Sequence, residues 1–266
     1  MPATPAETPA EDFSRADVGL VCALSMELNH FFDRCTKVRS VTGGGFRFRG
    51  GRLEGIRVAA VESGAGPNKA ARATQALLEG HRPAWVISCG FAGGLQPELR
   101  IGDIIVSSSV CDPGGVEIAT PHGMQPDPDK GLHVGRVLTT DRIVRTVAEK
   151  QELADRHSAI ACDMESHAVA SVCRDAKVPF MIVRSVTDGL AADLPAEVHA
   201  LLASTGAGRL GATVGALWNR PESVKDLWKL RENAAVAARR LAPFLAGVVE
   251  QLHAATKHAA KTRPGG

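Results

Sequence analysis

Residues 18–34 read VGLVCALSMELNHFFDR, and this stretch decides the fold. Up to Leu24 it is a continuous apolar run with the length of a buried strand. Ser25 then precedes a helical spacing of apolar residues and carries a side chain suited to a helix cap. The stretch therefore predicts a strand, a tight turn and a helix, which is the repeating unit of an α/β fold.

The same alternation of strands and helices continues to residue 188. Glycines 43–45 and the segments around residues 50–51 predict a β-hairpin followed by a buried strand, and Pro67 begins a helix at a position that tolerates proline. This alternation predicts a three-layer α/β domain whose mostly parallel, mixed central sheet is flanked by helices, with ligands bound beyond the carboxyl ends of the strands. Further strands are expected at 84–90, 101–110, 136–140, 158–164 and 179–188, and helices at 68–80, 143–157 and 165–177.

The chain divides into a core and two ends of different composition. Residues 1–15 are rich in Pro, Ala, Thr and Glu, so we expect a flexible leader before a domain at 16–215. C-terminal helices are expected at 216–256, because two helical patterns follow Trp218, the second with its apolar residues on one face. Residues 257–266 are expected to be a flexible basic tail. The segment 111–135 has no periodicity and is typical of a loop that covers a site.

Charge and cysteine content exclude several function classes. The net charge is +2, but residues 216–266 hold nine Lys and Arg against four Asp and Glu, which leaves −3 for residues 1–215. A core of this charge does not favour binding to nucleic acid. The six cysteines are scattered without metal-ligand spacing, so we expect buried thiols and no metal site. Without a signal sequence or an apolar span, the chain is expected to be cytoplasmic.

Four segments in order carry the functional residues. They are VCALSMEL with Glu27, CGFAGGLQPELRIGDIIV from Cys89, CDMESHAVASVC with Met164 and Glu165, and VPFMIVRSVTDG with Arg184 and Asp188. Together they resemble the 5′-methylthioadenosine/S-adenosylhomocysteine nucleosidases of the nucleoside phosphorylase superfamily, over roughly residues 17–195. The resemblance implies an N-glycosyl hydrolase that needs no cofactor.

Cleavage of an N-glycosidic bond puts positive charge on the ribose and negative charge on the departing purine, so it requires a proton donor and a positioned nucleophile. Asp188 follows an apolar strand, where desolvation is expected to raise its pKa and keep it protonated. The resemblance implies that Asp188 protonates the purine N7, that Glu27 activates water, and that Arg184 holds this water and the neighbouring carboxylates.

The resemblance also implies a set of substrate-binding residues. Glu165 would accept hydrogen bonds from both ribose hydroxyls, and Met164 would pack against the sugar. Backbone groups of Ile143 or Val144 would contact the adenine edge. Phe91 departs from the family, in which we expect a small hydroxyl residue at this position. The contacts that the family makes with the attacking water are therefore not carried over to Phe91. The complete expected set is Glu165, Met164, Gly90, Phe91, Ala92, Gly93, Ile143 and Asp163.

The nucleophile separates two enzyme classes. A phosphorylase needs cationic and amide donors for phosphate, whereas here an acid, Glu27, stands at the end of the first strand and favours water. A phosphate-dependent purine nucleoside phosphorylase is the alternative, and Arg184 is the residue that favours it. A non-catalytic nucleoside-binding protein would not need Glu27, Glu165 and Asp188 together. A dinucleotide-dependent dehydrogenase lacks its glycine motif after the first strand.

A looser similarity concerns the substrate. DMESHAVA and residues 208–241 are similar to hopanoid-associated proteins that remove adenine from adenosylhopane. This similarity implies a lipid-linked nucleoside and a peripheral contact of the basic C-terminal helices with the inner face of the membrane. The family resemblance also implies a homodimer. The sequence leaves the 5′ substituent of the substrate open.

Overall fold

The computed structural model describes residues 15–120, 122–191, 193–194 and 221–262. All but the last residue of the leader expected at 1–15, and most of the junction before the C-terminal helix, therefore lie outside the described residues. The first unit is as predicted: strand β1 (Val18–Cys22) turns directly into helix α1 (Ser25–Phe32). Leu24 rather than Ser25 is the residue that precedes the helix. The Ser25 hydroxyl instead donates to the Glu62 carboxylate.

Ten strands form one sheet in the described residues. Its order is β10-β6-β8-β9-β5-β1-β4-β3-β2, with β7 paired to β6, and β10 also pairs with β5. The pairing of β10 with β5 closes the first five strands into a barrel-like ring. The bounds are β2 Thr36–Gly43, β3 Phe46–Leu53, β4 Ile56–Glu62, β5 Trp85–Gly94, β6 Ile104–Cys111, β7 Glu117–Ala119, β8 Leu132–Thr139, β9 Ala161–Asp163 and β10 Phe180–Asp188.

The mixed central sheet confirms the predicted fold class, although its parallel share is smaller than expected. Five pairings are parallel (β1–β4, β1–β5, β10–β5, β6–β8 and β8–β9) and five are antiparallel. Two antiparallel pairings come from the hairpins β2–β3 and β3–β4, the first of which turns at Gly44 and Gly45 with positive φ angles of 60° and 83°. The expected strand beginning at residue 136 starts earlier, at Leu132, because it pairs along β6.

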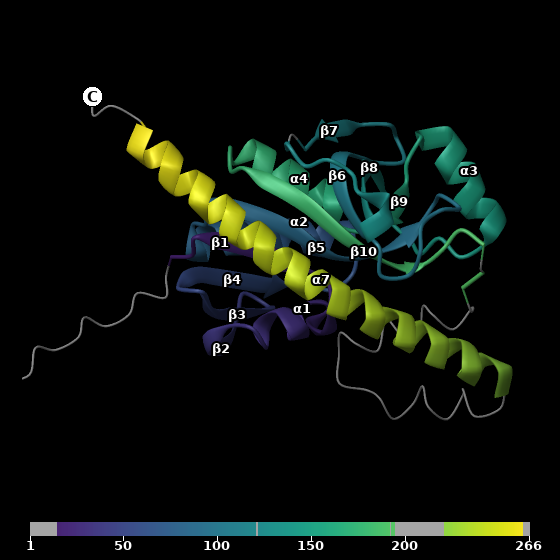
Figure 1. Ribbon diagram of the computed structural model, residues 1–266, viewed down its shortest axis with the longest axis horizontal. Helices are drawn as coiled ribbons and strands as arrows, with labels where there is room; N and C mark the ends of the chain where they lie inside the picture. Colours follow the sequence, from purple (N-terminus) through teal and green to yellow (C-terminus); the bar gives the residue numbers. More distant parts are fainter. Residues whose placement is uncertain (1–14, 121, 192, 195–220, 263–266) are drawn as a thin grey trace, which may run out of the picture.

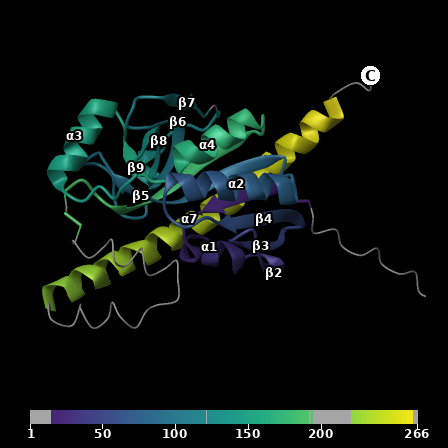
Figure 2. The same cartoon turned by 180° about the vertical axis from the view of Figure 1, so that it is seen from behind.

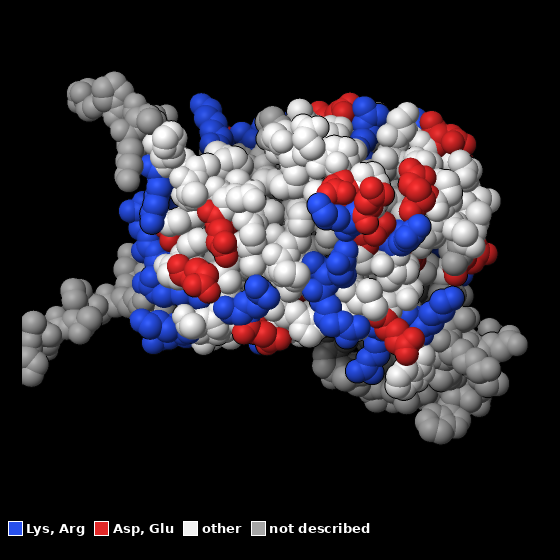
Figure 3. Space-filling model, in the orientation of Figure 1, with Lys and Arg blue, Asp and Glu red and all other residues white. Residues whose placement is uncertain are grey.

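Helices cover both faces of the sheet, which gives the predicted three layers. Helix α2 (Pro67–His81) and helix α4 (Ser166–Asp175) lie on one face, whereas α1 and the long helix α7 (Pro221–Thr262) lie on the other (Figures 1 and 2), which is the side that Figure 3 shows. Helix α3 (Val147–His157) lies at the end of the molecule beside β8 and β9 (Figure 1). It begins four residues later than expected, since Thr146 is its cap and accepts a hydrogen bond from the Glu149 amide.

The hydrophobic core follows the two-residue period of the strands. On β1, Leu20 and Cys22 belong to the cluster beneath α1 and α7, whereas Val21 belongs to the cluster beneath α2 and α4. A third cluster lies among β5, β6, β8 and β10, within the barrel-like ring. Five of the six cysteines are buried and all six are free, as expected for small core residues.

The C-terminal prediction requires a correction. A single helix, α7, occupies residues 221–262 in place of two helices ending at 256, and it includes residues expected in the flexible tail. Residues 254–260 (AATKHAA) are rich in alanine, which favours continuation of the helix. The apolar face predicted from Leu241 to Leu252 is correct, since Leu241, Leu245 and Val248 are buried against the sheet. In the described residues no helix combines the length and apolar character needed to cross a membrane.

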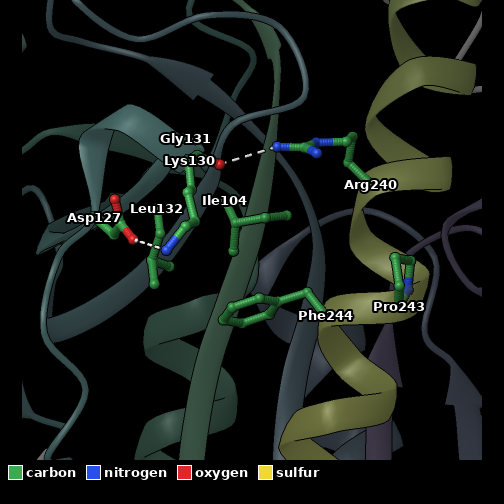
Figure 4. A pocket seen from close by; sticks show the side chains of 8 residues that line it. All are labelled: Ile104, Asp127, Lys130, Gly131, Leu132, Arg240, Pro243 and Phe244. Carbon is green, nitrogen blue, oxygen red and sulfur yellow. Dashed lines mark hydrogen bonds and ion pairs between the residues drawn. The ribbon is translucent and has the colours of Figure 1, made fainter.

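Where α7 passes β6 and β8 it leaves a hollow of about 320 Å³. Figure 4 shows Phe244 beside Ile104, the Arg240 guanidinium donating to the Lys130 carbonyl, and the Lys130 ammonium paired with Asp127. Pro243 also lines this hollow. The lining contains none of the site residues predicted from the sequence.

The segment 111–135 is more ordered than its composition predicts. It contains β7, the short 3-10 helix η1 (Pro128–Lys130) and the start of β8. The Thr120 amide donates to the Ser108 carbonyl and a His122 ring nitrogen lies 3.0 Å from the Ser107 carbonyl, so this part of the segment is attached to β6. These contacts give no support to a covering loop.

Candidate active site

The glycine-rich end of β5 is the floor of the candidate site. Gly90 pairs in register with Arg184 of β10. A Cβ atom at Gly90 would lie 2.5 Å from Glu27 Oε1 and 2.6 Å from Arg184 Nη1. Only a residue without a side chain fits there, because the carboxylate of α1 and the guanidinium of β10 meet over this backbone position.

Glu27 is buried at the start of α1. Its Oε2 accepts hydrogen bonds of 2.8 Å from the amides of Ala23 and Leu24, and its Oε1 accepts one of 3.0 Å from the Phe91 amide. Burial raises the pKa of this carboxyl, although these amides and Arg184 oppose the rise. A buried carboxylate whose pKa is moved toward neutrality is a better proton acceptor than a surface glutamate.

Arg184 is also buried, and its partners hold it in place. Its Nη2 lies 2.6 Å from Asp163 Oδ2 and donates to the hydroxyls of Ser88 (2.8 Å) and Ser166 (2.9 Å). Asp163, expected among the substrate-binding residues, is 1% exposed, and its Oδ1 accepts a 2.7 Å hydrogen bond from Thr139. The structure thus places Asp163 behind Arg184, where it fixes the guanidinium.

Glu165 lies between β9 and α4, at the residue that precedes the helix. Its Oε1 accepts a 2.8 Å hydrogen bond from the Gly66 amide, which belongs to the turn before α2. Burial, reinforced by the nearby Asp163 charge, raises the pKa of Glu165 to about 7. A carboxylate in this position has a second oxygen available for a sugar hydroxyl.

Asp188 ends β10, at the carboxyl end of the strand as predicted. Its Oδ2 lies 2.7 Å from the ammonium of Lys150, and its Oδ1 accepts a 3.0 Å hydrogen bond from Thr187. A Cβ at Gly93, its register partner, would lie 3.1 Å from Oδ2. Asp188 is therefore not isolated among apolar groups, as the sequence suggested, but is the partner of a buried cation.

The carboxylates form two groups along the carboxyl end of β5. Glu27, Glu165 and Arg184 lie close enough to affect one another electrostatically. Asp188 contacts β5 three residues farther along, which corresponds to about 10 Å of strand. This separation is similar to the length of a nucleoside, with the acid and Lys150 at one end and the other two carboxylates at the opposite end.

The other predicted residues surround these groups in different ways. Met164 is half-buried in the bend between β9 and α4, next to Glu165, and Phe91 is half-buried on β5. Ala92 is 4% exposed and packs in the core cluster within the ring, so its side chain serves packing. Ile143 is half-buried in the irregular segment before α3, and Val144 is buried beneath that helix.

The segment before α3 is tied to the chain that follows β10. The Val147 amide donates to Asp193 Oδ1 at 2.7 Å, and the Leu194 amide donates to the Arg145 carbonyl at 2.8 Å. Lys150 Nζ donates to the Gly189 carbonyl at 2.7 Å. Residues 143–150 therefore lie beside residues 188–191 and 193–194, around Asp188, where the purine end of a nucleoside is expected.

Four residues that contact the predicted side chains were not predicted from the sequence: Lys150, Gly66, Ser88 and Ser166. Lys150 did carry a signal, since it precedes Ala154 by one helical turn, and both are buried on the inner face of α3. A lysine at a core-facing position is uncommon without a partner. In the described residues no group of three or more His, Cys, Asp and Glu side chains has an arrangement suited to a metal ion.

Comparisons with known proteins identify the family of the chain. The family model of the phosphorylase superfamily matches residues 17–214. The 5′-methylthioadenosine/S-adenosylhomocysteine nucleosidase of Shewanella loihica is 32% identical over 215 residues, covering 71% of this chain and 93% of the relative. The protein of the same name from Tolumonas auensis is 28% identical over 211 residues, covering 70% and 91%.

Solved structures show the same fold. A 5′-methylthioadenosine/S-adenosylhomocysteine nucleosidase from Helicobacter pylori, solved with butyl-thio-DADMe-Immucillin-A, superposes with a TM-score of 0.68 at 18% identity, over 89% of this chain and 99% of that one. The futalosine hydrolase of the same organism gives a TM-score of 0.67 at 17% identity, over 88% and 97%.

Proposed function

The chain belongs to the phosphorylase superfamily, and from that premise we propose that it hydrolyses the N-glycosidic bond of a 5′-modified adenosine and releases adenine. The family predicted from the four motifs is confirmed, and so is the enzyme class, since the relatives are named as nucleosidases. The roles of individual residues and the identity of the substrate are part of the proposal.

Water rather than phosphate is the proposed nucleophile, and the position of Glu27 is the observation that carries this choice. Its carboxylate already accepts hydrogen bonds from the amides of Ala23, Leu24 and Phe91. Backbone amides of this kind are the donors that a phosphate anion would need. Arg184, the residue that favoured phosphate, is engaged with Asp163 and two serines. A dianion brought next to Glu27 would be repelled, whereas a neutral water molecule would be deprotonated by it.

At the sugar end, Glu165 is proposed to accept hydrogen bonds from the ribose hydroxyls. Holding the sugar beside this carboxylate stabilises the positive charge that develops as the bond to the base breaks. Glu27 removes a proton from the attacking water, and Arg184 keeps the two carboxylates apart and oriented. Met164, next to Glu165 in the chain, is proposed to pack on the sugar.

At the purine end, Asp188 is proposed to protonate the departing base. The irregular segment with Ile143 and Val144 lies beside residues 193–194, which supports the proposal that its backbone groups contact the purine edge. Protonation of a leaving group by a positioned acid typically accelerates such reactions by about 10²- to 10⁴-fold.

The test is to incubate the purified protein with a panel of 5′-modified adenosines, with and without inorganic phosphate, and to separate the products by chromatography. Hydrolysis releases adenine and the free sugar at a rate that does not depend on phosphate. Formation of the sugar 1-phosphate would identify a phosphorylase and refute the proposal. Asp188→Asn is expected to lose turnover while it keeps the fold, whereas Asp175→Asn, on an exposed residue of α4, is expected to keep normal activity.

For the 5′ substituent we propose a lipid-linked group such as that of adenosylhopane, reached at a membrane surface through α7. Supporting this, the N-terminal part of α7 extends past the sheet (Figure 1), and Trp228 on it is 62% exposed. Co-sedimentation with anionic vesicles is expected for the full chain and not for Trp228→Ala. Equal sedimentation of the two proteins, or none with either, would remove this part of the proposal.

We also propose that the enzyme works in the cytoplasm as a homodimer. Six free thiols suit a reducing compartment, and a two-fold homodimer is the commonest assembly of soluble enzymes. Sedimentation equilibrium at micromolar concentration tests the dimer, and the mass of a single chain would refute it.

A further inference from the structure

Lys150 is a buried ion partner of Asp188 that the proposed reaction has not yet used. Its side chain is 0% exposed, and its Nζ lies 2.7 Å from Asp188 Oδ2 and 2.7 Å from the Gly189 carbonyl oxygen. It comes from α3, so it joins a helix at the end of the molecule to the last residue of β10.

Stability alone does not account for a lysine at this position. Burial of an ammonium group carries a large desolvation cost, and a buried ion pair is often no more stabilising than packed apolar residues of the same volume. The neighbouring core of α3 is apolar, with Leu95, Leu138 and Val144 in the same cluster as Ala154. An apolar side chain at position 150 would continue that cluster.

Few other titratable groups face Asp188 in the described residues. Cys162 of β9 lies near both Asp188 and Lys150, and burial together with the Asp188 charge raises the pKa of its thiol, which stays neutral. From α7, the Asn233 amide donates to the Thr187 carbonyl at 3.0 Å and brings no charge. From β5, Gly93 contributes only backbone. Among the described residues, Lys150 is therefore the cation that forms an ion pair with Asp188.

We propose that Lys150 is a positioning residue that orients Asp188 and stabilises the carboxylate which Asp188 becomes after it has protonated the purine. This inference rests on the proposed function, since it concerns the acid of the same site. The contacts of Lys150 with Asp188 Oδ2 and with the Gly189 carbonyl fix the carboxyl plane of Asp188 relative to β5. The ammonium favours the anionic form of Asp188, so its stabilising effect grows as the proton leaves.

The proposed reaction moves one proton from Asp188 to the purine and one from water to Glu27. The O–H bond of protonated Asp188 breaks while an N–H bond forms on the purine, and the electron pair of the glycosidic bond moves onto the departing base. The attacking water gives its proton to Glu27 and forms the new C–O bond. Asp188 is left as a carboxylate beside Lys150, and Glu27 is left protonated. Once the products have left, Glu27 releases its proton to solvent and Asp188 takes one up, which restores the starting state.

The test compares Lys150→Met with wild type between pH 5 and pH 9 on the best nucleoside of the panel. A drop in kcat of about 10²-fold is expected with KM changed less than about threefold, because the acid and not the binding of substrate is affected. Lys257→Met, on an exposed residue of α7, is the matched control and is expected to change neither quantity.

A second substrate separates acid assistance from a general structural defect. A 5′-modified riboside with 4-nitrophenolate as leaving group departs without protonation, so Lys150→Met is expected to cleave it at a rate close to wild type. Equal losses of kcat on both substrates would overturn the proposal. If Lys150→Met does not fold, Lys150→Gln keeps a hydrogen-bond donor without the charge, and the same difference between the two substrates is expected from it.

Failure of this inference can be told apart from failure of the proposed function. The dependence of wild-type turnover on phosphate assigns the nucleophile, and the comparison of Lys150 variants holds for either nucleophile. Should wild type cleave no nucleoside, crystal structures of wild type and Lys150→Met give an independent readout. The carboxyl plane of Asp188 is expected to turn relative to Gly93 in Lys150→Met, and an unchanged orientation would refute the role of Lys150.

Discussion

Glu165→Gln is expected to stabilise the folded protein above neutral pH. In the fold, burial raises the pKa of Glu165 from 4.5 to about 7, whereas in the unfolded chain the group keeps its ordinary value. The unfolded state therefore loses this proton first as the pH rises. Stability that is fully present below about pH 4.5 is lost between there and about pH 7, and above pH 7 the fold carries a buried charge that the unfolded chain exposes to water.

The size of the effect follows from the two pKa values. A rise from 4.5 to about 7 corresponds to roughly 3 kcal/mol, at 1.36 kcal/mol per pH unit. Glutamine retains an oxygen that can accept the 2.8 Å hydrogen bond from the Gly66 amide, so little else is lost. The variant is expected to gain about 1 kcal/mol or less over wild type at pH 5, and about 2 to 4 kcal/mol at pH 8.

Urea unfolding followed by circular dichroism at pH 5 and pH 8 measures this difference. Glu79→Gln, on an exposed residue of α2, is the control and is expected to leave the stability unchanged at both values. The gain should be accompanied by loss of nucleoside cleavage, as is common where function requires a destabilising group. A gain that is equal at pH 5 and pH 8, or a loss of stability at pH 8, would show that burial does not raise the pKa of Glu165.

Three further predictions concern the site and the core. Gly90→Ala is expected to reduce the turnover rate by about 10²-fold, because the added methyl group displaces the Glu27 and Arg184 side chains by about an ångström. Gly80→Ala, with open space around it, is expected to keep normal turnover. Equal rates for the two variants would show that Glu27 and Arg184 do not lie against Gly90. Glu27→Gln is expected to lower kcat by about 10²- to 10⁴-fold and to abolish the loss of activity at low pH, and a retained acid limb would point to another base. Leu245→Ala in α7 is expected to cost about 2 to 5 kcal/mol in urea unfolding, while a change below 1 kcal/mol would mean that α7 is not part of the core.

Local patterns determined most of the secondary structure. The run from Val18 to Leu24 and the spacing from Ser25 onward specify a strand and a helix, because burial on one or both faces imposes a period that short-range sequence carries. The parallel share of the sheet was overestimated because the antiparallel pairing of β10 with β6 joins residues about 80 positions apart. Nothing in either segment alone records that pairing.

The same distinction applies to the site. By itself the sequence determined which acids stand at strand ends, since Glu27, Glu165 and Asp188 each follow an apolar strand and polar groups at such ends face solvent or a ligand. Only the tertiary structure decided their partners: Gly66 for Glu165, Asp163 for Arg184, and Lys150 for Asp188. The physical reason is that charge stabilisation depends on distances of a few ångströms between atoms, and these are set by how helices pack on the sheet, not by spacing along the chain.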